Sequence, residues 1–318
     1  MDDTILQQVS ILVQNAQRVL IVSHIRPDGD AIGSLLGLGL AIEEAGLDVQ
    51  MVLADGVPKN YRHLEGSDRV LKRPKGNFDL IFVVDSSDMS RIGEILDHYG
   101  QPDINIDHHI TNENYAKINL VETTAVATAE ILAELIPAII APISPKVAAA
   151  LLTGLITDTL GFRTYNMTPK AMRLAADLME IGADMPELYR RSLVARSFEA
   201  ARFWGSGLRL MERQGGLVWT TLTLEERSAA GYHGRGDADL INVLSSIEDA
   251  DIAIIFVEQP NGSIKVSWRA QPGFDVSQVA VSFGGGGHPA ASGADFTEEL
   301  DKVRATVLSK TLAILNNN

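Results

Sequence analysis

Residues 18–46 read RVLIVSHIRPDGDAIGSLLGLGLAIEEAG, and this stretch defines the fold of the first half of the chain. The apolar, branched run from Arg18 to Ser23 is typical of a buried parallel strand. A polar turn follows, and Ala31 to Ala45 then has the small and apolar residues of a packed helix, which Gly46 ends. A strand, a turn and a helix in this order form one unit of a parallel α/β sheet.

The same alternation continues beyond this unit. Further strands are expected at 49–53, 79–84, 103–106 and 116–121. Helices are expected at 91–99, 124–135 and 144–157. Repeated strand–helix units predict a mostly parallel sheet covered on both faces, so the fold class is α/β.

The length of 318 residues suggests about two domains. A helical, arginine-rich stretch begins at Pro186, and strands resume after Gly215-Gly216, with a hairpin turn at Pro260-Asn261-Gly262. We therefore expect an N-terminal parallel-sheet domain over residues 1–185, a helical linker over 186–213 and a smaller C-terminal α/β domain over 214–318.

Composition excludes several classes of protein. The chain has no cysteine, so any metal must be held by His, Asp or Glu. The net charge of −14 argues against a binder of duplex DNA. No apolar run approaches the ~18 residues of a membrane span, so no membrane partner is expected. The acidic, polar stretch Met1 to Gln8 does not resemble a secretory signal, so a cytoplasmic location is expected.

Asp and His residues gather directly after three of the expected strands. They are His24, Asp28 and Asp30 after the first strand, Asp85 after the third, and Asp107, His108 and His109 after the fourth. Ligands of open parallel sheets bind beyond the carboxyl ends of the strands, so these groups should meet at one edge. Each residue alone also fits a helix cap, a turn or a structural histidine. Together they predict a metal site, because several carboxylates in one pocket repel unless a cation neutralises them.

The ligand types and their number indicate which metal is expected. Imidazole and carboxylate together suit Mn²⁺ or a similar divalent ion better than an all-oxygen calcium site. More than four candidate ligands suggest two ions, and Asp158 at the end of the helix expected at 144–157 adds one more. Two such ions can clamp a phosphoryl group and generate hydroxide.

In this order, His24-x-x-Pro27-Asp28-x-Asp30, Asp85, Asp107-His108-His109 and Asp158 resemble the four motifs of the DHH phosphoesterase superfamily. The segment FGGGGHPAASG at 283–293 resembles the glycine-rich motif of the associated DHHA1 domain. The resemblance covers nearly the whole chain and is greatest to the branch of bifunctional oligoribonucleases and pAp phosphatases. Those are two-domain cytoplasmic enzymes of about this length.

The resemblance implies a role for each residue of the first domain. One Mn²⁺ would be held by His24, Asp28 and Asp85, and the other by Asp30, Asp85, His108 and Asp158, with Asp85 bridging. His109 would bind the phosphate or donate a proton to the leaving oxygen, and Asp107 would orient the histidines. A hydroxide activated by the two ions would attack phosphorus in line, with Mg²⁺ or Co²⁺ as substitutes for Mn²⁺.

In the second domain, the backbone N–H groups of Gly285, Gly286 and Gly287 can point at a phosphate. His288 can donate to a phosphate or a base, and the resemblance implies that Arg269 grips the substrate phosphate. A plain glycine-rich turn is the alternative. A dinucleotide fingerprint ending at Ala290 is rejected, because only 28 residues follow it.

Arg163 closely follows Asp158 and could face the cleft, although a surface role fits it equally well.

The expected activity is Mn²⁺-dependent hydrolysis of short oligoribonucleotides to mononucleotides and of pAp to AMP. The expected partners are therefore short RNA and pAp, and the resemblance suggests a homodimer. A phosphodiesterase of linear or cyclic dinucleotides, pApA or cyclic di-AMP, is the alternative. A family II inorganic pyrophosphatase is disfavoured, because those enzymes lack the glycine-rich His motif. A non-catalytic nucleotide-binding module is disfavoured because every motif position is filled.

Overall fold

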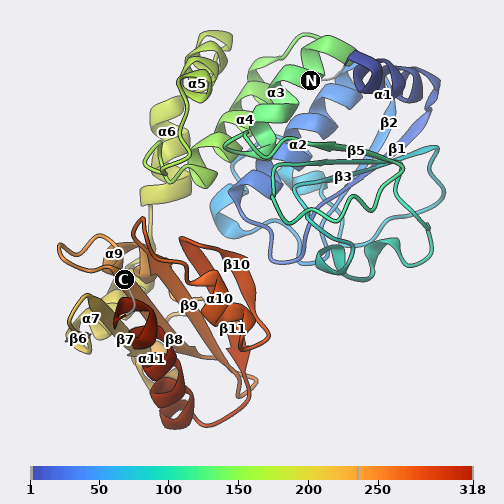
Figure 1. Cartoon of the computed structure of the whole chain (residues 1–318). Helices are drawn as coiled ribbons and strands as arrows, with labels where there is room; N and C mark the ends of the chain where they lie inside the picture. The colour runs from blue at the N-terminus through green and yellow to red at the C-terminus, as the bar shows by residue number, and fades with distance from the viewer. Residues whose placement is uncertain (1–2, 235, 317–318) are drawn as a thin grey trace. The chain divides into compact units, whose positions relative to one another are not determined.

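The computed structural model describes residues 3–234 and 236–316 and forms two compact units (Figure 1). The boundary between the units lies between Ala195 and Arg196, inside the segment expected to link two domains. Each unit has its own sheet and its own buried apolar core. No helix in the described ranges is both long and apolar enough to cross a bilayer.

The first unit is built on a five-stranded parallel sheet with the order β2-β1-β3-β4-β5. The strands are β1 (Arg18–Val22), β2 (Asp48–Val52), β3 (Leu80–Val84), β4 (Ile104–Asp107) and β5 (Ile118–Val121). All five residues of β3 are buried, as expected of a strand that is covered on both faces. The parallel α/β sheet predicted from the sequence is confirmed.

Helices cover one face of this sheet. They are α1 (Asp3–Asn15), α2 (Gly29–Glu44), α3 (Thr128–Ile139) and α4 (Pro145–Asp158), followed by α5 (Pro169–Ile181), which packs on α4. The other face is covered by loops and a 3₁₀ segment, Ser90–Leu96. The helix expected at 91–99 is therefore wrong, because Gly93 adopts φ 71° and ψ −150° and interrupts the helical path.

Glycines allow α2 and α4 to approach closely. A Cβ atom at Gly33 would lie 2.5 Å from the Ala150 carbonyl oxygen and 2.7 Å from the Gly154 nitrogen. A Cβ atom at Gly154 would lie 2.6 Å from Asp30 Oδ1. This packing brings Asp30, near the start of α2, to the helix that ends in Asp158.

The segment expected to be one connector helix is divided. Helix α6 (Met185–Tyr189) continues into a π-helical turn, Arg190–Val194, and the backbone becomes extended at Ala195. The Ser197 side chain then accepts a hydrogen bond from the Ala200 N–H and starts α7 (Phe198–Arg209). The new N-cap explains why the helical pattern does not form one continuous helix.

The second unit contains a six-stranded mixed sheet with the order β10-β11-β9-β8-β7-β6. The strands are β6 (Glu212–Gln214), β7 (Leu217–Leu222), β8 (Ile252–Glu258), β9 (Ile264–Ala270), β10 (Gly286–His288) and β11 (Ala291–Phe296). Strands β7 and β8 pair parallel, and the other neighbours pair antiparallel. The hairpin predicted at 260–262 joins β8 to β9.

Helices pack on both faces of the second sheet. They are α7, α8 (Leu224–Ala230), α9 (Leu240–Leu244), α10 (Ser277–Val281) and α11 (Leu300–Asn316). Trp268 of β9 is fully buried, and its Nε1 donates to Thr311 Oγ1 of α11 at 3.1 Å. Phe203 of α7 lies in a separate core on the opposite face.

Candidate metal centre

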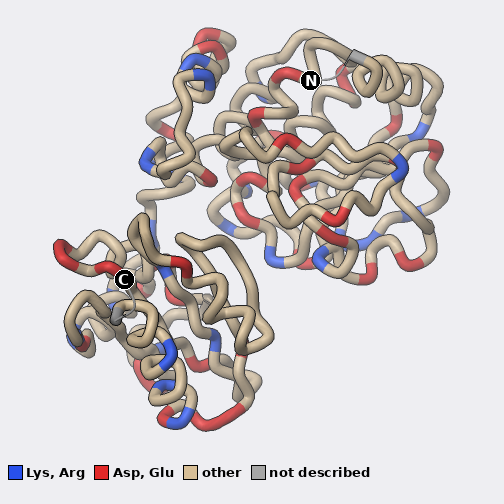
Figure 2. Tube along the Cα trace, in the orientation of Figure 1, with Lys and Arg blue, Asp and Glu red and all other residues tan. Residues whose placement is uncertain are grey.

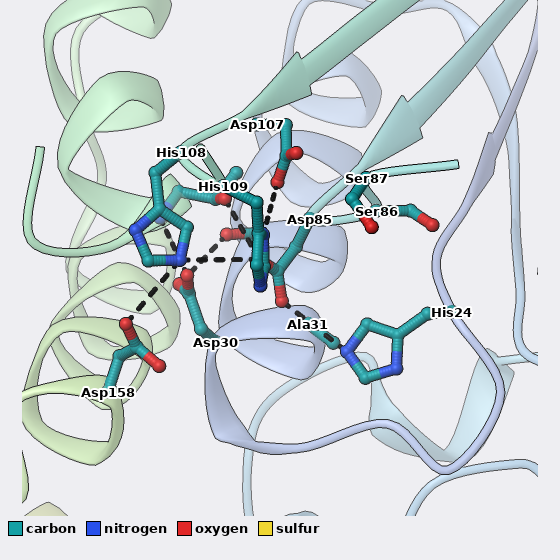
Figure 3. Close-up of polar contacts among 12 residues, drawn as sticks. His24, Asp30, Ala31, Asp85, Ser86, Ser87, Asp107, His108, His109 and Asp158 are labelled. Carbon is teal, nitrogen blue, oxygen red and sulfur yellow. Dashed lines mark hydrogen bonds and ion pairs between the residues drawn. The ribbon is translucent and has the colours of Figure 1, made fainter. Parts of the chain in front are cut away.

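The Asp and His cluster lies where the strand order of the first sheet reverses. Strand β1 is followed in space by β2 on one side and by β3 on the other, so the chain winds in opposite directions from this point. His24 follows β1, and Asp85 follows β3 (Figure 3). Ligand sites of open α/β sheets form at such a switch point. The expected meeting of strand ends is therefore present in the structure.

The first group of possible ligands comprises His24, Asp28 and Asp85. His24 Nε2 lies 3.5 Å from Asp85 Oδ2 and 3.8 Å from Asp28 Oδ1. The other ring nitrogen, Nδ1, contacts the Ile25 carbonyl oxygen at 2.8 Å, which favours a proton on Nδ1. His24 Nε2 is buried with no hydrogen-bond partner in the described structure, as expected of an atom that binds a cation.

The second group comprises Asp30, His108 and Asp158. His108 Nε2 lies 3.5 Å from Asp158 Oδ2 and 3.9 Å from Asp85 Oδ1. The two oxygens of Asp85 therefore face different histidines, Oδ2 toward His24 and Oδ1 toward His108. This is the geometry of a carboxylate that lies between two ligand groups.

The distances fit shared cations. In each group the ligand atoms all lie within 4.8 Å of one another. Two donors at about 2.0–2.2 Å from one ion lie at most about 4.4 Å apart, which accommodates the 3.5–3.9 Å separations measured between the Nε2 and Oδ atoms. The donor set of imidazole nitrogens and carboxylate oxygens suits a divalent transition metal.

Asp85 adopts a strained backbone conformation. Its φ is 55°, in the left-handed region, while its N–H donates to the Ile106 carbonyl oxygen at 2.9 Å. A non-glycine residue held there costs about 1–3 kcal/mol, and such residues cluster at functional sites. The strain places a buried carboxylate between the two groups.

Thr128, at the first turn of α3, holds the carboxylates of both groups. Its N–H donates to Asp30 Oδ2 at 2.6 Å, and its hydroxyl donates to Asp85 Oδ1 at 3.0 Å. The next N–H, of Ala129, donates to Asp30 Oδ1 at 3.0 Å. Thr128 is not among the predicted site residues, because this helix was expected to begin at residue 124. The partners of Thr128 are remote in sequence, so no local motif identifies it.

His109 lies beside this cluster. Its Nδ1 is 2.7 Å from Asp107 Oδ1 and 3.8 Å from Asp85 Oδ1. Asp85, His108 and His109 are also close enough to share a cation. However, Nδ1 is the His109 atom near Asp85, and the fully buried Asp107 carboxylate already engages it. This contact places Nε2 on the side of the ring away from Asp107.

The pKa values of the cluster show that a cation would compete with protons for these groups. Burial, and next the nearby Asp85, raise the pKa of Asp30 to about 7. Burial and Asp30 raise the pKa of Asp158 well above its usual value. Burial opposes the charged form of His108, but Asp158 and Asp30 outweigh it and raise the pKa of His108 to about 9. Without a cation, protons therefore neutralise these carboxylates.

The pKa values of His24 and Asp85 are set by the same opposition between burial and neighbouring charges. Burial disfavours the imidazolium of His24, but the neighbouring carboxylates of Asp28 and Asp85 outweigh it and raise the pKa of His24 to about 10. Burial also opposes the ionised form of Asp85, yet His24 lowers the pKa of that carboxyl below its usual value. Asp85 is thus the carboxylate that stays ionised between the two groups.

Arg163 lies outside this arrangement. It is exposed, and its Nε donates to the Leu160 carbonyl oxygen of its own turn at 3.0 Å. Among the described residues, Arg163 forms no ion pair with the Asp cluster.

The substrate-binding candidates of the second unit lie on β9 and on the β10–β11 hairpin. Arg269 donates to the Trp268 carbonyl oxygen at 3.0 Å, and burial lowers its pKa, although Asp237 and Asp239 oppose the shift. His288 is exposed at the end of β10. Arg269 is thus a partly buried cation with two carboxylates near it.

The glycines of this hairpin differ in how much space a side chain would have. A Cβ atom at Gly285 would lie 2.2 Å from the Gly293 carbonyl oxygen, and one at Gly287 would lie 2.5 Å from that of Ala291. A Cβ atom at Gly286 would meet nothing within 4 Å. Close packing of the hairpin therefore explains Gly285 and Gly287, whereas a side chain at Gly286 would meet open space. The Gly285 N–H, one of the expected phosphate donors, already donates to the Ala280 carbonyl oxygen at 2.9 Å.

A parallel sheet with an Asp/His cluster at its switch point, followed by a mixed-sheet unit, defines a two-domain α/β hydrolase with a divalent-metal site. The chain belongs to the DHH family. Residues 18–155 match the DHH family N-terminal domain, and residues 226–312 match the DHHA1 domain. The family predicted from the motifs is confirmed.

Similar proteins include a bifunctional oligoribonuclease and PAP phosphatase NrnA of Thermus thermophilus, 34% identical over 91% of this chain and 88% of that protein. A cyclic-di-AMP phosphodiesterase GdpP of Geobacillus thermodenitrificans is 24% identical over 90% of this chain but 46% of its own length. A solved structure of an exopolyphosphatase-related protein from Bacteroides fragilis has a TM-score of 0.89 and 26% identity, covering 98% of this chain and 96% of that one.

Proposed function

We propose that this chain is a Mn²⁺-dependent phosphoesterase that hydrolyses short oligoribonucleotides to mononucleotides and dephosphorylates pAp to AMP. The observation that carries the proposal is Asp85, whose two oxygens face His24 and His108 in adjacent ligand groups. The similarity to the Thermus thermophilus oligoribonuclease and PAP phosphatase over nearly both chains supports the substrate class.

Different residues of the first unit would have different roles in hydrolysis. His24, Asp28 and Asp85 would hold one divalent cation, and Asp30, Asp85, His108 and Asp158 would hold the other. When bound, such cations neutralise phosphate charge and lower the pKa of water. His109 would carry a proton on Nε2 and donate it to the oxygen that leaves phosphorus, while Asp107 fixes the imidazole through Nδ1.

The second unit would bind the substrate. Arg269 and His288 would contact a phosphate, and backbone N–H groups at Gly286 and Gly287 would be further donors. Arg163 would add a further cation at the substrate. Acidic residues are spread through both units, and Lys and Arg do not form one continuous stripe along the described trace (Figure 2). This charge distribution favours a short nucleotide over a long strand or duplex.

A phosphodiesterase of cyclic or linear dinucleotides is the second candidate. It is supported by the similarity to the cyclic-di-AMP phosphodiesterase, which however contains about as much additional chain as it shares with this one. We also propose that the protein acts in the cytoplasm, where RNA fragments arise, and that it forms a homodimer.

The test is product analysis with the purified full chain in Mn²⁺, Mg²⁺ or Co²⁺. The substrates are pApA, a five-nucleotide RNA, pAp, cyclic di-AMP and pyrophosphate. Release of mononucleotides from the RNA and of AMP from pAp is the expected result. Activity confined to cyclic di-AMP or pyrophosphate would contradict the proposed substrate. Nucleotide binding without turnover would instead indicate a non-catalytic module.

A further inference from the structure

We propose that Asn112 is a positioning residue for His109 and acts through Asp107. The inference rests on the proposed function, in which His109 faces the substrate phosphate. Asn112 is three residues beyond His109, in the loop between β4 and β5. Neither its position in the sequence nor its residue type distinguishes it from an ordinary loop asparagine.

The contact between Asn112 and Asp107 is direct. Asn112 Nδ2 donates to Asp107 Oδ2 at 2.6 Å, while His109 Nδ1 lies 2.7 Å from Asp107 Oδ1. One fully buried carboxylate therefore divides its two oxygens between an amide and an imidazole. Two hydrogen bonds in different directions fix the plane of a carboxylate, which one bond alone leaves free to rotate.

Asn112 is itself held on both sides. Its Nδ2 also donates to Asn105 Oδ1 at 2.8 Å, and its Oδ1 accepts the Asn114 N–H at 2.8 Å. Asn105 Nδ2 in turn donates to Tyr115 Oη at 3.0 Å. The amide of Asn112 thus has a defined orientation, with its donor end toward Asp107.

The network is anchored on the strand that carries Asp85. Tyr115 Oη donates to the Ser86 carbonyl oxygen at 2.9 Å, and Asn105 Nδ2 lies 3.3 Å from the same oxygen. Ser86 directly follows Asp85. The chain of hydrogen bonds therefore fixes His109 relative to the backbone that presents the proposed bridging carboxylate.

The chemical consequence concerns the His109 ring. A buried charge needs hydrogen-bond donors, and Asp107 obtains one from Asn112 and one from His109 Nδ1. A proton kept on Nδ1 orients the ring so that Nε2 points away from Asp107. Loss of the Asn112 donor leaves part of the buried carboxylate unsatisfied and releases both the rotamer of Asp107 and the tilt of the ring.

The experiment compares Asn112→Ala in the wild-type chain and in a His109→Ala chain. In the wild-type chain, kcat should fall on the order of 10- to 100-fold, as when a residue supporting a functional ligand is lost, while KM changes little. In the His109→Ala chain the same substitution should cause no further loss. An equal loss of kcat in both chains, or an unchanged kcat in the wild-type chain, would overturn the proposal.

Asn119→Ala is the matched control. Asn119 braces the same loop through Ala116, with contacts of 3.0 and 2.8 Å, but makes no hydrogen bond to Asp107 in the described structure. This variant should lower stability without changing kcat. A kcat loss equal to that of Asn112→Ala would mean that general loosening of the loop is sufficient, which contradicts a specific positioning role.

A second readout covers the case in which Asn112→Ala fails to fold or the wild-type chain hydrolyses none of the substrates. Asn112→Ser retains a small donor and should recover part of the activity. Nitrogen-15 NMR of the histidine rings should show one sharp Nδ1–H signal of His109, hydrogen-bonded to Asp107, in the wild type and a shifted or broadened signal in Asn112→Ser. Identical spectra would overturn the proposal whether or not the proposed function holds.

Discussion

The two units support their candidate functional groups in opposite ways. In the first unit the carboxylates Asp30 and Asp85 are almost fully buried, and helix α3 holds both through Thr128. In the second unit Gly286 and His288 lie exposed on a three-residue edge strand. Under the proposed function, the first unit would fix the geometry of the reaction and the second would supply affinity for an anion. Substitutions in the first unit should therefore change kcat, and those in the second should change KM.

The largest effect is expected for Asp85→Asn. Asparagine tolerates the left-handed backbone at φ 55°, so the substitution removes the charge between His24 and His108 without adding strain. We expect kcat to fall by at least about 1,000-fold, because cations contribute several kcal/mol to phosphoryl chemistry. Steady-state kinetics and calorimetric Mn²⁺ titration measure the effect. The exposed Asp97→Asn is the control, and full activity of Asp85→Asn would refute the metal assignment.

A second comparison uses glycines of the two units. Gly33→Ala forces a Cβ atom to within 2.5 Å of the Ala150 carbonyl oxygen, so α2 and α4 must separate. The free energy of unfolding should fall by about 1–3 kcal/mol. Gly286→Ala meets open space and should change that free energy by less than about 0.5 kcal/mol. Denaturant titrations followed by circular dichroism measure both, and equal losses would contradict the packing described for α2 and α4.

Arg269→Ala tests the second unit directly. Loss of a charged hydrogen bond to phosphate costs about 1.5–3 kcal/mol, so KM for pAp should rise roughly 10- to 100-fold. Mn²⁺ affinity should stay unchanged, because Arg269 belongs to the other unit from the Asp cluster. The exposed Arg202, whose guanidinium donates to the Ala229 carbonyl oxygen at 3.0 Å, provides an Arg→Ala control. A fall in kcat with constant KM would contradict this assignment of roles to the two units.

The last comparison uses pH, which acts on cation affinity and leaves the sequence unchanged. In the metal-free protein the pKa values of His24 and His108 are about 10 and about 9, so both imidazoles carry protons at pH 7.5. Cation binding must displace these protons, and lowering the pH strengthens the competition. Mn²⁺ affinity should therefore decrease as pH falls from 9 to 7, by roughly tenfold per pH unit for each proton displaced.

Calorimetry in buffers of different ionisation enthalpy measures the protons released. The exposed His98 provides the control, since His98→Gln should leave the slope unchanged. An affinity independent of pH in this range would contradict the raised pKa values.

Periodicity predicted the parallel sheet well, because buried strands are short, apolar and rich in branched residues. The strand expected at 79–84 is observed as Leu80–Val84, and the one at 103–106 as Ile104–Asp107. The helix predicted at 91–99 does not form, because Gly93 adopts a conformation that residue preference alone does not predict. The linker does not form the single helix that was predicted, also for a local reason: Ser197 caps the start of a new helix.

The cluster of Asp and His residues was predictable because strand order brings strand ends together. The residues that hydrogen-bond to the cluster could not be predicted in this way. Thr128 and Asn112 are ordinary helix-start and loop residues in sequence, and only tertiary contacts bring them to Asp30 and Asp107. The packing of the β10–β11 hairpin, which requires glycine at 285 and 287, was likewise not visible in the sequence, and a phosphate contact at this hairpin stays a prediction.

The docking of α2 on α4 has a consequence for synthesis of the protein. Asp30 and Asp158 come together only after the chain has been translated through α4. At about 5–20 residues per second, Asp158 follows Asp30 by roughly 6–25 seconds on the ribosome. Throughout that interval the nascent chain holds the earlier acidic residues without the helix that completes their surroundings. The group of Asp30, His108 and Asp158 is therefore completed late, after most of the first unit has been translated.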